Sequence, residues 1–205
     1  MKKVILISAG CIFILGTIVF IMAQPNGRRF LPAPGRLINS MQETNTNPLP
    51  SLKNPRIVVK KQERKLYLYD EEKLLKTYNI GLGFAPEGDK EKQGDGKTPE
   101  GNFYIFTKNA KSRFYLSLGV SYPGIDDAER GLRDKLITKK QHDAIVSAIK
   151  QGRTPLQNTA LGGEIYIHGG GSATNWTLGC VALTNEEIKE LFEAVPVGTK
   201  VSIQP

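Results

Sequence analysis

The sequence predicts a mainly β fold for residues 56–205, a sandwich or barrel of short strands with one helical insertion. Apolar residues alternate with polar ones over short segments, which is the pattern of half-buried strands. Glycine and proline turn signals separate these segments at short intervals, as in sandwiches and barrels. With 40% apolar and 23% charged residues, the composition excludes wholesale disorder, a collagen-like fibre and a polytopic membrane protein.

The first half of this domain supplies five strand candidates. They cover residues 57–59, 66–69, 74–83, 103–107 and 114–120. A charged turn over 60–65 joins the first two, and Leu66 and Leu68 lie on one face of the second. A polar, glycine-rich loop over 86–97 and a Thr-Pro-Glu-Gly turn over 98–101 separate the third strand from the fourth.

Residues 126–152 have a different pattern and are expected to form a helical insertion in the sheet. Thr138 is a candidate cap for a helix that passes through Ile145 and ends near Gly152. The insertion is expected to act either as a lid over the site or as a purely structural element.

The strand pattern returns over 164–167 and leads directly into His168. Thr184 and Glu187 then have the Thr-x-x-Glu spacing of a capping box, which predicts a short helix. A last strand is expected over 197–203.

The chain begins with a candidate export segment, residues 1–23. Lys2 and Lys3 precede an uncharged apolar stretch over 4–23. At ~1.5 Å rise per residue, twenty apolar residues cover the ~30 Å hydrocarbon core of a bilayer. We therefore expect an anchor in the inner membrane, with a cleaved signal peptide as the alternative. Either one places the rest of the protein outside the cytoplasm, in the periplasm or cell envelope.

Residues 24–55 are expected to be a proline-rich linker. They hold six of the twelve prolines and have no apolar periodicity, so they cannot build a core. The linker is long enough to let an anchored domain work away from the membrane surface.

The charge and the cysteine count exclude other classes. The formal net charge is +8, but no basic helix or basic stripe interleaved with aromatic residues is present, so no nucleic-acid partner is expected. Two cysteines are too few for a disulfide scaffold or a four-ligand zinc site. We expect no metal and no cofactor.

Cys180 is the single cysteine outside the apolar stretch. An unpaired thiol is a liability in an oxidising compartment, so a catalytic role gives a reason for its presence. His168 precedes it by twelve residues and is the candidate base that takes the thiol proton. Gly179 frees the backbone so that N–H groups can point at one spot, as an oxyanion hole requires. The alternative is a buried structural cysteine and a histidine that is merely hydrogen-bonded.

The run Ile167-His168-Gly169, followed by Thr177-Leu178-Gly179-Cys180-Val181-Ala182-Leu183, resembles the catalytic domain of L,D-transpeptidases, the YkuD-like family. The likeness covers most of residues 56–203 and includes a Gly-Asp-Gly-Lys-Thr-Pro-Glu-Gly segment over 94–101. It implies an L,D-transpeptidase-like β fold and a cysteine enzyme that acts on peptidoglycan stem peptides. By position, it implies Cys180 as nucleophile, His168 as general base and the Gly169 carbonyl as the group that orients the imidazole. The backbone N–H groups implied for the oxyanion hole are those of Leu178, Gly179 and Cys180.

Two positions depart from the family pattern. Leu178 stands where the family usually has histidine, and Ala182 stands where it often has arginine or asparagine. We interpret both as divergence in specificity, because the attacking pair is intact. Candidate substrate contacts are Trp176, Arg113 and Tyr122.

The resemblance implies that Cys180 attacks the carbonyl of the third stem-peptide residue and forms a thioester. An amine, carried by another stem peptide or by a protein, then captures the acyl group, or water hydrolyses it. A hydrolase of the same family (amidase or L,D-carboxypeptidase) and a non-catalytic wall-binding module remain as alternatives. A papain-like or NlpC-like hydrolase is disfavoured because there the cysteine usually precedes the histidine.

Overall fold

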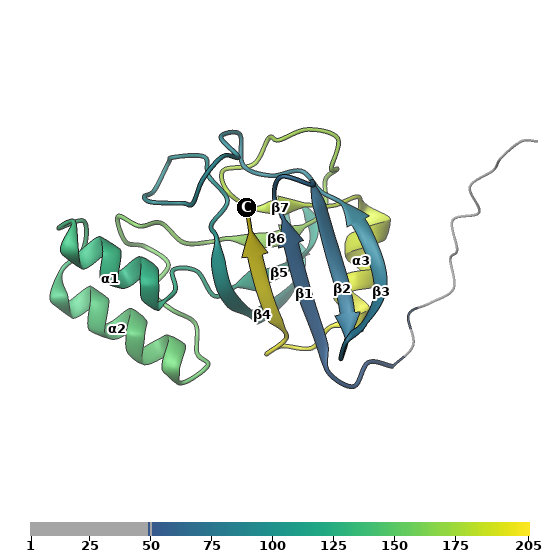
Figure 1. The fold of residues 1–205 in the computed structure, drawn as a ribbon, viewed down its shortest axis with the longest axis horizontal. Helices are drawn as coiled ribbons and strands as arrows, with labels where there is room; N and C mark the ends of the chain where they lie inside the picture. The colour runs from purple at the N-terminus through teal and green to yellow at the C-terminus, as the bar shows by residue number, and fades with distance from the viewer. Residues whose placement is uncertain (1–48, 50) are drawn as a thin grey trace, which may run out of the picture. The chain divides into compact units, whose positions relative to one another are not determined.

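The structure, a computed structural model, describes residue 49 and residues 51–205. One curled β-sheet organises this part of the chain, so the predicted mainly β class is confirmed (Figure 1). The strand order is β3-β2-β1-β8-β4-β5-β6-β7. The strands are β1 (Pro55–Lys60), β2 (Lys65–Asp70), β3 (Lys73–Asn79), β4 (Gly101–Ser112), β5 (Tyr115–Val120), β6 (Tyr166–His168), β7 (Val181–Ala182) and β8 (Lys200–Gln204).

The twelve-residue strand β4 joins the two halves of the sheet. Its first residues pair with β8 and its later residues pair with β5, both antiparallel. Burial alternates along β1, β2 and β8 and along the first half of β4, whereas the last four residues of β5 are all buried. Side chains from both halves of the sheet meet in a shared core. That core includes Ile57 and Leu68 from one half and Leu118 and Ile167 from the other.

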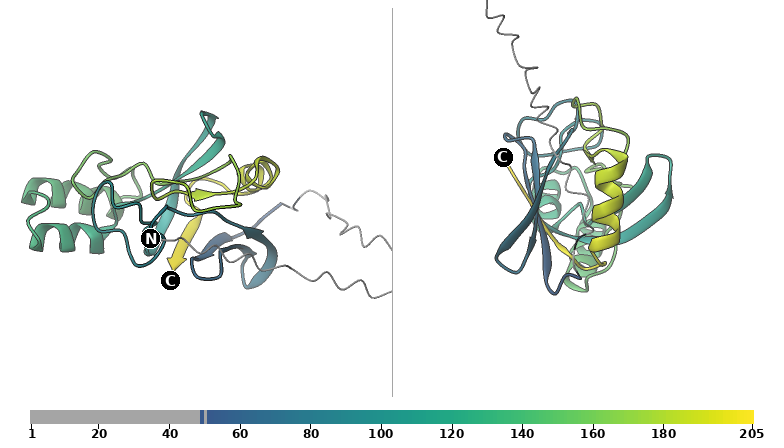
Figure 2. Two further views of the ribbon diagram at one scale, coloured as in Figure 1. Left: turned by 90° about the horizontal axis from the view of Figure 1, so that it is seen from above. Right: turned by 90° about the vertical axis from the view of Figure 1, so that its right-hand side faces the viewer.

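Three helices complete the fold. Helix α3 (Asn185–Ala194) packs on β5 and β6 and buries Ile188 and Leu191 in the main core. Its capping box between Thr184 and Glu187 is present as the sequence predicts. Helices α1 (Ile125–Arg133) and α2 (Lys139–Lys150) pair with each other at the opposite end of the domain from α3 (Figures 1 and 2). Within the described residues, no helix combines the length and the apolar character needed to cross a membrane.

The structure corrects three element predictions. The insertion holds two helices where the sequence indicated one, and α1 was missed because Gly131 lies inside it and weakens the helical pattern. Gly131 is needed there, since a Cβ atom would lie 2.7 Å from the side chain of Leu161. The third strand ends at Asn79, and beyond it Gly81 and Gly83 form only single bridges. The two-residue strand β7 was not predicted.

The export segment and most of the linker lie outside the described residues, so the expectations placed on them stay predictions.

Candidate active site

His168 is the last residue of β6, where sheet pairing on both sides fixes its backbone. Strand β6 pairs antiparallel with β5 and parallel with β7. The side chain is 2% exposed, and its Nδ1 lies 2.6 Å from the carbonyl oxygen of Gly169. Because a carbonyl oxygen only accepts hydrogen bonds, Nδ1 carries the hydrogen and the neutral ring keeps Nε2 free to act as a base. The contact is the one that the family resemblance implied for Gly169.

Two aromatic rings enclose the imidazole. The Phe114 ring stacks on His168 with 4.5 Å between ring centroids, and the Trp176 ring meets it edge-on at 5.6 Å. The Trp176 indole N–H donates to the carbonyl of Gly171 at 3.1 Å, which fixes the ring plane. Burial lowers the pKa of His168, and the nearby positive charge of Arg113 lowers it further. The imidazole is therefore neutral at pH 7 and able to accept a proton.

Cys180 lies directly before β7, with its thiol held by the backbone that leads into β6. The N–H of Tyr166 donates to Sγ at 3.4 Å, and Sγ donates toward the carbonyl of Glu164 at 3.5 Å. Burial raises the pKa of the thiol to about 11, although the bond from Tyr166 opposes the change. The thiol is therefore protonated at pH 7. The resting pair is thus a neutral thiol and a neutral imidazole.

The nucleophile turn, residues 177–180, is held by the side chain of Thr177. Its hydroxyl donates to the carbonyl of Cys180 at 2.8 Å and accepts from the N–H of Gly179 at 3.1 Å. Gly179 has φ +132°, and a Cβ atom there would lie 2.7 Å from the carbonyl oxygen of Lys97. Both the conformation and the close approach require glycine.

The hydrogen bond to Thr177 corrects the expected oxyanion hole. The N–H of Gly179 already has a partner inside the turn, so it is not available to a substrate oxygen. The N–H groups of Leu178 and Cys180 have no hydrogen-bond partner among the described residues. Two free donors remain of the three that the resemblance implied.

Cys180 and His168 line one cavity of about 600 Å³. Its walls come from the end of the β4–β5 hairpin, from residues 163–168, from the nucleophile turn and from part of the loop before β4. No hydrogen bond joins the Cys180 thiol to the imidazole in this part of the chain. Residues 51–205 contain no group of three or more histidine, cysteine, aspartate or glutamate side chains arranged to hold a metal ion.

The predicted substrate contacts divide into two groups. Arg113 and Trp176 line the cavity, and Leu178 stands at its mouth with 70% of its surface exposed. Tyr122 does not belong to the site, and this corrects the prediction. Its side chain has no exposed surface, and its hydroxyl donates to the carbonyl of Leu161 at 2.9 Å in the interior. A side chain without accessible surface cannot touch a substrate.

Sequence reasoning missed three residues of the site. The sequence places Phe114 in a strand and gives it no role, although its ring stacks on His168. Lys90 and Glu164 line the cavity and bring charge to it. The sequence signal that could have found Glu164 is the Gly162-Gly163 pair before it, because paired glycines permit an unusual backbone. In the structure Glu164 itself has φ +54°.

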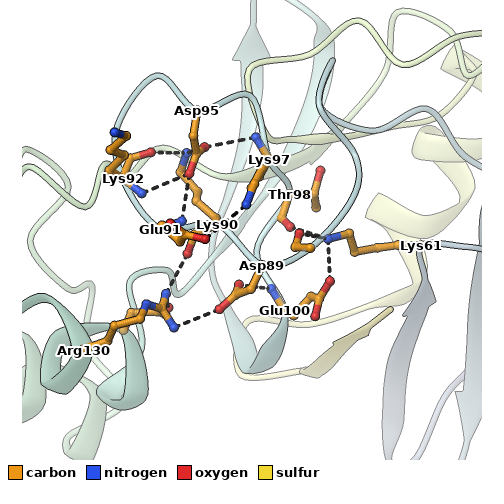
Figure 3. A network of polar contacts seen from close by, with 12 residues as sticks. Lys61, Asp89, Lys90, Glu91, Lys92, Asp95, Lys97, Thr98, Glu100 and Arg130 are labelled. Carbon is orange, nitrogen blue, oxygen red and sulfur yellow. Dashed lines mark hydrogen bonds and ion pairs between the residues drawn. The ribbon is translucent and has the colours of Figure 1, made fainter.

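An ion-pair network holds the loop that supports the nucleophile turn (Figure 3). The carboxylate of Asp95 accepts hydrogen bonds from three backbone N–H groups, and Lys90 Nζ donates to it at 2.7 Å. Arg130 of α1 pairs with Asp89 at 2.9 Å and so ties the loop to the helical insertion. Since the Lys97 carbonyl of this loop faces Gly179, the network supports the backbone directly before Cys180.

Replacing Asp95 by asparagine is expected to lower the free energy of unfolding at pH 7 by about 2 kcal/mol. Burial by itself raises the pKa of Asp95, but hydrogen bonds from Lys90 and from the backbone lower it to about 2. A carboxylate with a depressed pKa stabilises the fold above pH ~4, and this contribution is lost as the pH falls toward 2. Urea unfolding followed by circular dichroism at pH 7, 4 and 2 measures it.

The matched control for this prediction is Asp126→Asn, which changes an exposed aspartate of α1. It is expected to stay within about 0.5 kcal/mol of the wild type at every pH. Equal stability of Asp95→Asn and the wild type at pH 7 would show that the network does not stabilise the fold.

Comparison with known proteins identifies similar sequences. The family model of the L,D-transpeptidase catalytic domain, YkuD, matches residues 54–203. YafK of Escherichia coli K12, named as an L,D-transpeptidase, is 30% identical over 156 residues, covering 73% of this chain and 50% of that protein. YqjB of Bacillus subtilis, named likewise, is 27% identical over 184 residues, covering 86% of this chain and 85% of that protein. This chain therefore spans about half the length of the Escherichia coli relative.

Among solved structures, the helical cell shape determining protein Pgp2 of Campylobacter jejuni is similar, with 22% identity and a TM-score of 0.48. The match covers 76% of this chain and 50% of that chain.

Proposed function

This chain belongs to the L,D-transpeptidase catalytic-domain family, and from that premise we propose that it is a cysteine acyltransferase acting on peptidoglycan stem peptides. The observation that carries the proposal is the placement of Cys180 and His168 in the wall of one cavity. The imidazole has its Nδ1 committed to Gly169 and its Nε2 free, as a general base requires.

In the first step a thioester forms on Cys180. As the third-residue carbonyl of a stem peptide approaches Sγ, His168 Nε2 takes the thiol proton, because the resting thiol is neutral. The backbone N–H groups of Leu178 and Cys180 donate to the developing oxyanion. Collapse breaks the L-to-D amide bond, and the imidazolium returns its proton to the departing amine of the D-amino acid.

In the second step the thioester is consumed. An amine from another stem peptide or from a protein captures the acyl group and gives a wall cross-link or an attached protein. Water instead gives hydrolysis, the activity of an amidase or L,D-carboxypeptidase. The neutral thiol is regenerated in both cases.

Two side chains are proposed as substrate contacts. The Arg113 guanidinium lies over the Phe114 ring at 4.8 Å, and no carboxylate of the described residues pairs with it. It is therefore available to a stem-peptide carboxylate. Trp176 is proposed to form an apolar wall beside the base, since 39% of its surface is exposed at the cavity.

We further propose that the domain works outside the cytoplasm, where peptidoglycan is built. The apolar segment over 4–23 would anchor it to the inner membrane or be removed as a signal peptide, and residues 24–55 would tether it.

The test is the intact mass of the protein after incubation with a disaccharide-tetrapeptide, with and without an amine acceptor. Wild type is expected to gain the mass of the acyl group, because the step that removes the terminal D-amino acid leaves a thioester. Analysis of the released products then separates transfer from hydrolysis. Absence of an acyl-enzyme in the wild type would contradict the mechanism and favour a non-catalytic wall-binding module.

A further inference from the structure

The charges that line the catalytic cavity are unequally distributed. Three cations, Lys90, Lys111 and Arg113, face a single carboxylate, that of Glu164, among the described residues. Lys90 is already paired with Asp95 at 2.7 Å. The side chain of Glu164 is exposed and has no hydrogen bond or ion pair within residues 51–205. The Glu164 carboxylate is therefore available to bind a cationic ligand.

The backbone of Glu164 fixes this charge beside the nucleophile. Its N–H donates to the side-chain carbonyl of Gln157 at 2.7 Å, and its own carbonyl lies 3.5 Å from Cys180 Sγ. The residue has φ +54°, so the chain turns sharply there and the side chain leaves the backbone at the cavity wall. The Glu164 carboxylate therefore belongs to a residue whose backbone carbonyl contacts the Cys180 thiol.

We propose that Glu164 binds the ammonium group of the acceptor amine and so makes the second half-reaction selective for cationic acceptors. The inference rests on the proposed function, because it concerns the amine that captures the acyl group from Cys180. A carboxylate and an ammonium group form a charge-assisted hydrogen bond. The carboxylate repels an acceptor whose nearest charge is negative.

The ammonium group held by Glu164 loses one proton to the neutral His168 Nε2 and becomes a nucleophilic amine. Its nitrogen attacks the thioester carbonyl, a C–N bond forms and the C–S bond breaks. The thiolate takes the proton from the imidazolium, and the second nitrogen proton leaves to solvent. A thioester and an ammonium group thus yield an amide, the Cys180 thiol and one proton.

The experiment compares wild type, Glu164→Gln and the control Glu129→Gln, which changes an exposed glutamate of α1 outside the cavity. Each full-length protein is acylated with a disaccharide-tetrapeptide and then offered one of two acceptors. The first is a cationic amino-acid amide. The second is hydroxylamine, which is uncharged at neutral pH. Intact mass gives the acylation rate, and product analysis gives the ratio of captured amine to hydrolysed acid.

Glu164→Gln is expected still to form the acyl-enzyme, because only the backbone of this residue hydrogen-bonds to the thiol. Its ratio of captured cationic amine to acid is expected to fall about tenfold, as an ion pair between carboxylate and ammonium is replaced by a hydrogen bond from ammonium to an uncharged amide. Capture of hydroxylamine by Glu164→Gln is expected to equal that by the wild type. A substitution that merely disturbed the structure of the site would lower the capture of both acceptors. Glu129→Gln is expected to match the wild type in all three readouts.

Two results would overturn the inference while leaving the proposed function intact. In the first, Glu164→Gln forms the acyl-enzyme normally and captures the cationic amine in the same ratio to hydrolysed acid as the wild type does. The other is a wild-type acyl-enzyme that hydrolyses without ever yielding the amide. A wild type that forms no acyl-enzyme would overturn both the inference and the proposed function.

Discussion

Replacing Cys180 by alanine is expected to abolish the acyl-enzyme and to lower turnover of a disaccharide-tetrapeptide by roughly 10⁴-fold or more. The variant keeps the base and the two free N–H donors but has no atom that can form the covalent intermediate. Serine at this position is expected to be almost as poor, since a hydroxyl in the same site is a much weaker acid than a thiol. Chromatography of released D-amino acid, with intact mass, measures both variants.

The fold of these variants is expected to survive. Within residues 51–205 the thiol makes two hydrogen bonds, both long, at 3.4 and 3.5 Å, so their loss removes little stability. Melting temperatures close to wild type would confirm that the loss is chemical. Release of D-amino acid by Cys180→Ala at the wild-type rate would show that the nucleophile lies elsewhere.

Replacing His168 by alanine is expected to slow turnover by about 10²- to 10⁴-fold and to remove the acid limb of the pH profile. Burial lowers the pKa of His168 in the free protein, so the neutral, proton-accepting form is present at and above neutral pH. In the wild type, kcat/KM should rise with pH as His168 loses its proton, with a pKa below 6.5. It should then stay level until the Cys180 thiol, with a pKa of about 11, begins to ionise. Initial rates between pH 4 and 9 measure this limb.

The chain offers a matched control for this experiment in its second histidine. His142 lies on α2, away from the cavity, and contacts Asp143. His142→Ala is expected to keep both the rate and the acid limb. An acid limb that persists in His168→Ala would assign the base to another group and contradict the proposed mechanism.

Local pattern was enough to predict most of the fold. Strands β1, β2, β4, β5 and β8 follow from alternation, and the capping box of α3 follows from the spacing of Thr184 and Glu187, because these signals need only neighbouring residues. Helix α1 was missed because Gly131 is favoured by contact with Leu161, thirty residues away, rather than by helix propensity. Strand β7 was missed because two residues carry no periodicity.

The sequence predicted some residues of the candidate site correctly and one of them wrongly. Cys180, His168 and the carbonyl of Gly169 followed from residue type, spacing and family resemblance, and the structure places them in or beside one cavity. Tyr122 was predicted wrongly, because an aromatic residue in a strand-rich domain has no local signal that separates a core position from a cavity wall.

The sequence alone determined the chemical types available, a lone thiol and an imidazole on a β scaffold, because these depend on residue identity and short-range order. Only the tertiary structure decided that burial raises the pKa of the thiol, that the N–H of Gly179 is already occupied and that the backbone carbonyl of Glu164 lies beside Cys180 Sγ. The physical reason is that pKa values and free donors are set by burial and by backbone groups brought together from distant segments. The parallel pairing of β6 with β7 brings such segments together beside Cys180.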